Sequence, residues 1–167
     1  MKSVIEKGSN QNIILNLNVF DAFGDYPFLW AIIKDNIEII QAIIEYANRN
    51  NVFIELNKKD IMGNYPLLMA ANKNNTEMFK LITEYVNHHN IILDLNEKDI
   101  SGNYPLLMAI VKNNSEMVHL IVEYANQNSI RVEFSESDLK NEMLKQYSNI
   151  QNLENINTDI IKELYQN

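Results

Sequence analysis

The apolar positions of this 167-residue chain predict short amphipathic helices arranged in pairs. Over residues 76–89 the apolar side chains recur at steps of one, three and four residues, which places them on one face of a helix. Residues 66–73 predict a shorter helix that begins at Pro66, where no amide hydrogen is needed, and ends at Asn74 or Asn75. Neither helix can bury its apolar stripe alone, so stacking on neighbouring pairs must form the core.

This pair of helices is repeated with a period of 39 residues. The longest match is a run of eight identical residues at 63–70 and 102–109. A strand-like segment opens each repeat, at 13–18, 52–57 and 91–96, and an aspartate and a glycine then mark a turn. Such a period is typical of stacked repeat proteins. The residues that recur in register are Gly24, Gly63 and Gly102, Pro27, Pro66 and Pro105, Ala31, Ala70 and Ala109, and Tyr46, Tyr85 and Tyr124.

A single array accounts for the whole chain. It divides into a partial repeat over 1–12, three repeats over 13–51, 52–90 and 91–129, and a divergent repeat over 130–167. The partial repeat aligns with the second helix of a pair, so it is either a capping stub or the end of an array cut from a longer one. The divergent repeat has Asn141 in place of the turn glycine and Leu144 in place of the proline. Because polar residues dominate it, we expect it to cap the array.

Composition limits the functions open to the chain. Apolar residues make up 46% of it, enough for a packed core, and 22 acidic against 14 basic residues give a net charge of −8. This charge argues against nucleic acid or an anionic membrane as the partner. The absence of cysteine excludes disulfides and thiolate chemistry and fits a reducing compartment, so we expect an intracellular, cytoplasmic protein. The longest apolar run, residues 28–33, is too short to span a membrane.

The sequence offers no candidate catalytic or cofactor site. A catalytic pair of carboxylates needs two different environments, whereas the turn aspartates are equivalent, and we interpret them as turn residues: Asp21, Asp60 and Asp99. The histidines lack partners at metal-ligand spacing and are interpreted as surface residues: His88, His89 and His119. Neither a phosphate-binding loop nor a nucleophile elbow occurs. We therefore expect no cofactor, no metal and no enzymatic activity.

The stretches 60–70 and 99–109, with 21–31 as a looser copy, resemble the ankyrin repeat. That family's pattern is a turn aspartate and a glycine followed by Thr-Pro-Leu-His and an alanine. The resemblance covers residues 13–129 well and the flanks weakly. It implies an all-α helix-turn-helix solenoid with protruding turns and room for short β pairing between them. It also implies a protein-binding scaffold, although fold alone does not fix function.

Two departures from the family pattern lead to expectations. Tyrosine replaces its threonine and leucine its histidine, at Tyr26, Tyr65 and Tyr104 and at Leu29, Leu68 and Leu107. We expect Asp25, Asn64 or Asn103 to cap the first helix of each repeat instead. The six residues beyond the usual period of about 33 follow the second helix, which predicts a longer second helix and a longer strand-like segment.

Three further sets of equivalent positions have predicted roles. A left-handed conformation is expected where the family has glycine after the first helix, at Asn74, Asn113 and Asp35. One position of the first helix could form a ligand ladder, but the helix needs an apolar core residue there, so we predict core packing for Trp30, Met69 and Met108. A stacked ladder between repeats, with hydroxyls at the rim, is predicted for Tyr46, Tyr85 and Tyr124.

By the resemblance, a partner contacts the turn tips and the exposed side of the first helices, which form a concave face. The candidate partner-binding residues there are Phe23, Asp25, Ile33, Lys34, Ile61, Met62, Asn64, Asn72, Lys73, Ser101, Asn103, Val111 and Lys112. The differences among otherwise near-identical repeats are not explained by packing, and we expect Phe23, Ile33 and Met62 to be apolar anchors. Alternatively, Ile61 and Ile100 pack between adjacent turns. The recurring lysines either meet an acidic partner or are simply solvated.

Three hypotheses of function follow. The first is a protein–protein interaction module that binds an unidentified protein through the turn tips and the concave face. The second is a structural or self-associating array, a monomer or a weak oligomer, because a missing half repeat would expose residues such as Val4 and Ile5. The third is the interaction fragment of a larger multidomain protein or enzyme.

Overall fold

The structure, a computed structural model, describes residues 14–135, 137 and 138, and every structural statement below concerns these residues. Its helices are α2 (Pro27–Ile33), α3 (Ile37–Asn50), α4 (Pro66–Asn72), α5 (Thr76–His89), α6 (Pro105–Val111) and α7 (Ser115–Gln127). The helix α5 begins and ends where the sequence predicts, and α4 is one residue shorter than predicted. The predicted partial repeat over 1–12 lies outside the described residues, as does most of the predicted capping repeat.

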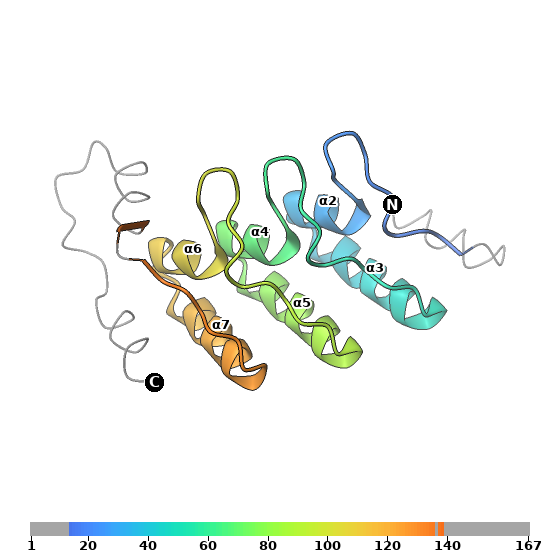
Figure 1. The fold of residues 1–167 in the computed structure, drawn as a ribbon. Helices are drawn as coiled ribbons and strands as arrows, with labels where there is room; N and C mark the ends of the chain where they lie inside the picture. The colour runs from blue at the N-terminus through green and yellow to red at the C-terminus, as the bar shows by residue number, and fades with distance from the viewer. Residues whose placement is uncertain (1–13, 136, 139–167) are drawn as a thin grey trace.

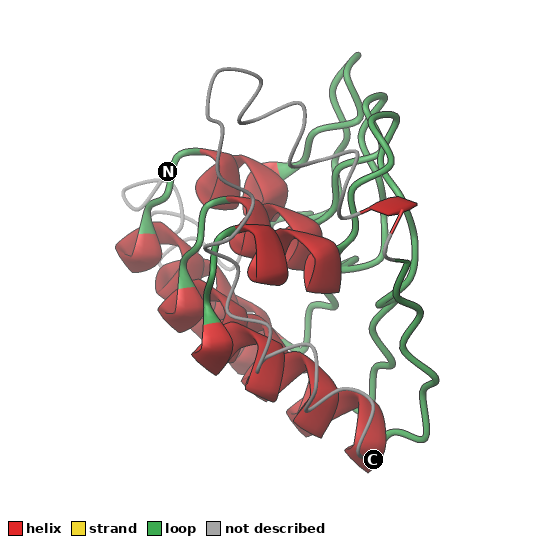
Figure 2. Ribbon diagram, turned by 90° about the vertical axis from the view of Figure 1, so that its left-hand side faces the viewer, coloured by secondary structure: helices red, strands yellow, loops and turns green. Residues whose placement is uncertain are grey.

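The three helix pairs stack side by side in two layers (Figure 1). The first helices α2, α4 and α6 form one layer, and the second helices α3, α5 and α7 form the other. The turns that precede the first helices all project from the same side of the array (Figures 1 and 2). One apolar core runs between the layers and through all three pairs. The fold is therefore the predicted all-α stack with protruding turns.

Each first helix begins at a proline that follows an extended tyrosine. These tyrosines occupy the N-cap position, and none of the three helix starts has a side-chain cap. The prediction that Asp25, Asn64 or Asn103 caps these helices is therefore wrong. Proline at the first helical position has no amide hydrogen to satisfy, which reduces the need for a cap.

The link between the two helices of a pair contains the predicted left-handed residue. Asp35, Asn74 and Asn113 adopt this conformation, with φ of 54°, 57° and 53°. The residue that follows each of them is an asparagine N-cap that the sequence pattern did not predict. In α5 the side-chain oxygen of Asn75 accepts a hydrogen bond from the amide of Met78 at 3.0 Å. Asn36 and Asn114 cap α3 and α7 in the same way.

The tyrosines of the second helices are buried, and their hydroxyls are directed to the extended segments. Each hydroxyl oxygen accepts a hydrogen bond from a backbone amide of an extended segment. The pairs are Tyr46 with Leu15 at 2.7 Å, Tyr85 with Ile54 at 3.2 Å and Tyr124 with Leu93 at 3.0 Å. These bonds satisfy backbone amides of the extended segments that border the second helices.

The strand-like segments run extended, but no β-strand occurs among the described residues. Asparagine side chains link neighbouring segments instead. The side-chain nitrogen of Asn57 donates to the carbonyl of Ile92 at 2.8 Å, and its oxygen accepts from the amide of Asp94 at 3.1 Å. Asn18 and Asn96 make the same two bonds to the following repeat. These three residues, which we call the asparagine ladder, link the segments that the sequence predicts as strand-like.

Candidate functional site

The three protruding turns have the same internal scaffold. In the second turn, one carboxylate oxygen of Asp60 accepts hydrogen bonds from the amides of Met62 and Asn64, both at 2.8 Å. Gly63 then adopts a φ of +80°, which a residue without a Cβ reaches at low cost. Asp21 and Asp99 make equivalent bonds in the first and third turns. The turn aspartates are therefore structural, as predicted.

Adjacent turns are joined near their tips by single backbone hydrogen bonds. The amide of Ile61 donates to the carbonyl of Phe23 at 2.9 Å, and the amide of Ile100 donates to the carbonyl of Met62 at 3.0 Å. The backbone of the tips is thus fixed from one repeat to the next. The expected β pairing between turns is limited to these bonds within the described residues.

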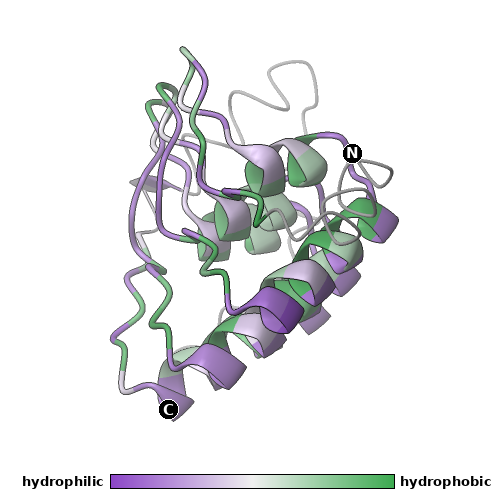
Figure 3. Ribbon diagram, turned by 90° about the vertical axis from the view of Figure 1, so that its right-hand side faces the viewer, coloured by the Kyte–Doolittle hydropathy of each residue, from purple (hydrophilic) through white to green (hydrophobic). Residues whose placement is uncertain are grey.

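Large apolar side chains are exposed at these tips. The ribbon of Figure 3, coloured by hydropathy, shows hydrophobic and hydrophilic residues side by side along the projecting turns. Phe23 is 62% exposed, Met62 48%, and the isoleucines Ile61 and Ile100 62% and 66%. The alternative that these isoleucines pack between adjacent turns is wrong, because only their backbone amides bond to the neighbouring turn while their side chains stay in solvent. The result is a row of apolar groups in water on a fixed backbone.

Core packing is predicted for one position of the first helices, and the three repeats differ in how far they follow that prediction. Trp30 is 40% exposed, Met69 is half-buried, and only Met108 is buried at 2%. Core packing is therefore the wrong prediction for Trp30. This position lies at the margin of the core, and the indole is large enough to extend past it into solvent. The ammonium of Lys34 lies 4.5 Å from the centre of the Trp30 ring, which is cation–π geometry.

The other predicted contact residues fall into three groups by exposure. Lys34, Lys112 and Ser101 are exposed, like the tip residues. The half-buried ones are Asp25, Ile33, Asn64, Asn72, Lys73 and Asn103. Val111 is buried, so it departs from the exposed position expected of a partner contact. The side-chain amides of Asn64 and Asn103 are directed to their own turn aspartates, at 2.8 and 2.9 Å, and serve the turn.

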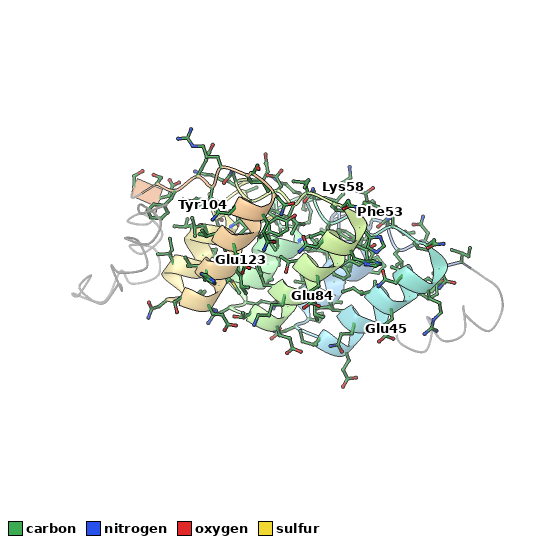
Figure 4. The ribbon with its side chains drawn as sticks, turned by 90° about the horizontal axis from the view of Figure 1, so that it is seen from below. Glu45, Phe53, Lys58, Glu84, Tyr104 and Glu123 are labelled. Atoms are coloured by element: carbon green, nitrogen blue, oxygen red, sulfur yellow. The ribbon has the colours of Figure 1, made fainter. Side chains whose placement is uncertain are left out.

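A lysine occupies the C-cap position of each of the three first helices. These are Lys34, Lys73 and Lys112. The ion pairs among the described residues involve other lysines: Lys59 with Glu97, Lys80 with Glu116 and Lys98 with Asp138. The lysine row, as we call Lys34, Lys73 and Lys112, is thus left without a carboxylate partner in the described part of the chain. The face opposite to the turns is acidic, with Glu45, Glu84 and Glu123 one on each second helix (Figure 4).

Other classes of site find no support in the described residues. They contain no group of three or more histidine or acidic side chains that could hold a metal ion. None of the helices among them has the length and apolar character needed to cross a membrane.

Stacked helix pairs of similar length, joined by projecting turns with one scaffold, define a helical solenoid of short repeats. Residues 51–133 match the family model described as ankyrin repeats in three copies. The crystal structure of an ankyrin repeat domain from Acinetobacter baumannii AYE is similar, with a TM-score of 0.58 and 18% sequence identity. The match covers 74% of this chain and 56% of that domain. Residues 51–133 are therefore ankyrin repeats, and the described array has the ankyrin repeat fold.

Comparison with curated proteins gives no significant match. Ankyrin repeats are in general protein–protein interaction modules and are typically not enzymes. This role is general to the family, and the partner and the binding surface depend on the residues of the individual chain.

Proposed function

We propose that the chain is a protein-recognition module whose partner binds the turn tips and the adjoining side of the first helices. The observation that carries this proposal is the row of exposed apolar side chains at the tips. Such side chains gain most when a partner removes them from water, and the rigid backbone beneath them lowers the entropy lost on binding. Phe23 and Met62 are the proposed anchors, and Trp30 extends the surface onto α2.

The lysine row supports a partner that presents acidic groups beside apolar ones. Its ammonium groups lie at equivalent ends of α2, α4 and α6, and no described carboxylate neutralises them. Complementary charge steers a partner and sets its orientation. The acidic face of the second helices repels the same partner, so the two faces of the molecule differ in what they attract.

Affinity capture with paired variants tests this surface. Phe53 is 48% exposed, the same as Met62, but lies in an extended segment away from the tips, so Phe53→Ala is a matched control. Proteins retained by the wild type should be lost with Phe23→Ala and Met62→Ala and kept with Phe53→Ala. Anchors of this kind cost at least about 2 kcal/mol of binding free energy when truncated. Equal retention by all three variants would refute the proposed surface.

Self-association through the exposed segment that precedes the first turn is a second candidate function. Val19 and Phe20 are exposed there, whereas the second repeat has Lys58 and Lys59 at the equivalent positions. The double variant Val19→Lys/Phe20→Lys therefore uses residues that the fold already accepts. If this segment mediates association, light scattering over a concentration series shows a mass increase for the wild type and a constant monomer for the variant. A wild type that stays monomeric rejects this candidate.

A further inference from the structure

Among the side chains in which the first turn, residues 21–25, differs from the other two, the one at position 25 changes the hydrogen-bonding chemistry of the turn. In the second turn the side-chain nitrogen of Asn64 donates to Asp60 Oδ2 at 2.8 Å, and Asn103 donates to Asp99 in the third at 2.9 Å. The first turn has Asp25 at this position. Its backbone is the same, because the Asp25 amide still donates to Asp21 Oδ1 at 3.0 Å. The first turn therefore has a carboxylate at the position where the other two turns have a side-chain amide that donates a hydrogen bond.

One oxygen is alike in the first and third turns, because Asp25 Oδ1 and Asn103 Oδ1 are both buried without a hydrogen-bond partner. The difference lies at the other side-chain atom, where Asn64 and Asn103 donate to the turn aspartate and Asp25 has an oxygen instead. An ionised carboxylate in this place can accept but not donate, and the Asp21 carboxylate of the same turn can also only accept. The hydrogen bond made in the other two turns is thus missing from the first as long as both groups are ionised.

The charged groups that act on Asp25 are of one sign. Asp21 belongs to the same turn, and Asp60 belongs to the second turn, against which Gly24 packs closely. Lys59, the neighbouring cation, has its ammonium on Glu97, and Tyr26, the next residue, has a neutral buried hydroxyl. Burial first, and then the Asp21 and Asp60 carboxylates, raise the pKa of Asp25 above its ordinary value.

We propose that the first turn is a pH-responsive element, in which a protonated Asp25 donates to Asp21 the hydrogen bond that asparagine donates in the other turns. No covalent step is involved, and the proton comes from and returns to water. The proposal does not depend on the proposed protein-binding function. It does bear on the surface, because this turn carries Phe23 and is joined to the second turn through the Phe23 carbonyl.

The sign of the effect follows from linkage. A carboxyl whose pKa is raised by folding binds its proton more tightly in the folded state. Its contribution to stability is complete below the unfolded-state pKa of about 3.9 and is lost as the pH rises through the folded-state pKa. The first turn is therefore tightest in acid and loosest at neutral pH, whereas the second and third turns have no such dependence from their asparagines.

Two reciprocal variants of the full chain test the proposal. In Asp25→Asn the donor is present at every pH, so the unfolding equilibrium constant at pH 7 should fall by roughly two- to tenfold, the range for one hydrogen bond. The difference from wild type should shrink as the pH is lowered. Asn64→Asp transfers the same defect to the second turn and should raise the unfolding constant at pH 7 by a similar factor, again less in acid.

Carbon-13 NMR titration of the carboxyl groups provides a readout that does not require unfolding. The Asp25 carboxyl carbon should titrate above the ordinary value of about 3.9, and its signal is assigned by its loss in Asp25→Asn. A titration at or below that value overturns the proposal. An Asp25→Asn effect that is zero or constant with pH also overturns it, even if Asn64→Asp does not fold.

Discussion

At the scale of residues, identical side chains in register have different partners. The hydroxyl of Tyr65 donates to the carbonyl of Glu97 at 3.0 Å, and that of Tyr104 accepts from the amide of Ser135 at 3.2 Å. The hydroxyl of Tyr26 is buried without a partner. Burial raises the pKa of all three, so each hydroxyl keeps its proton. What distinguishes these tyrosines is the backbone of the next repeat.

Removing the hydroxyl should therefore have opposite effects in two repeats. Tyr65→Phe breaks a hydrogen bond and leaves the Glu97 carbonyl without it, which should cost about 1 kcal/mol of unfolding free energy. Tyr26→Phe removes a buried polar atom that has no partner, so it should be neutral or stabilising. Urea denaturation of the two variants checks this. A loss of stability in Tyr26→Phe as large as in Tyr65→Phe would show that the Tyr26 hydroxyl is in fact bonded.

The turn glycines offer a second residue-scale comparison. Gly63 and Gly102 have similar φ, +80° and +87°, so alanine costs both about 1 to 2 kcal/mol of backbone strain. A Cβ at Gly63 would also lie 2.7 Å from the Cα of Asp99, whereas no described atom lies within 4 Å of one at Gly102. Gly63→Ala should therefore destabilise more than Gly102→Ala in thermal or urea unfolding. Equal losses of unfolding free energy in the two variants would mean that the backbone of the third turn moves away from the added Cβ at little cost.

At the scale of elements, the sequence predicts what depends on local pattern. Helix α5 has its predicted bounds, and the left-handed residues after the first helices lie where the family has glycine. Contacts to the following repeat are not predictable from local pattern. In the sequence the residues of the asparagine ladder look like ordinary strand residues. Their hydrogen-bond partners lie 35 and 37 residues further along the chain, where a local pattern cannot reveal them. The prediction that Trp30 packs in the core fails for a similar reason. Periodicity gives the face of a helix on which a side chain lies, but not how far that side chain extends into solvent.

The asparagine ladder can be tested element by element. Asn57→Ala removes two hydrogen bonds to the next extended segment, and we expect a loss of about 1 to 2 kcal/mol with faster amide exchange at Asp94. Asn87 is an exposed asparagine of α5 outside the ladder, and Asn87→Ala is the control, expected to be neutral or slightly stabilising because alanine favours helix. Exchange at Asp94 that is the same in both variants would remove the ladder as a link between repeats.

At the scale of the whole molecule, stability is shared between neighbours. The described helix pairs pack on the pairs beside them, as Figure 1 shows, so the array behaves as a row of units coupled at their interfaces. The middle pair has a described neighbour on both sides. A defect in the middle pair weakens its interfaces with both the first and the third pair. The same defect in the first pair weakens only the interface with the middle pair, among the described residues.

Phe79 and Ile40 occupy the same register position in the second helices of the middle and first pairs, and both are fully buried. Phe79→Ala should cost about 3 to 5 kcal/mol and Ile40→Ala about 2 to 5 kcal/mol, from lost burial and the cavity left behind. The distribution of the loss is the sharper test, because the two totals overlap. Hydrogen exchange followed by mass spectrometry should show faster exchange in α3, α5 and α7 for Phe79→Ala, but an increase concentrated in α2 and α3 for Ile40→Ala. If α7 responds equally to both variants, the array unfolds as one cooperative block, and nearest-neighbour coupling is too strong to separate its repeats.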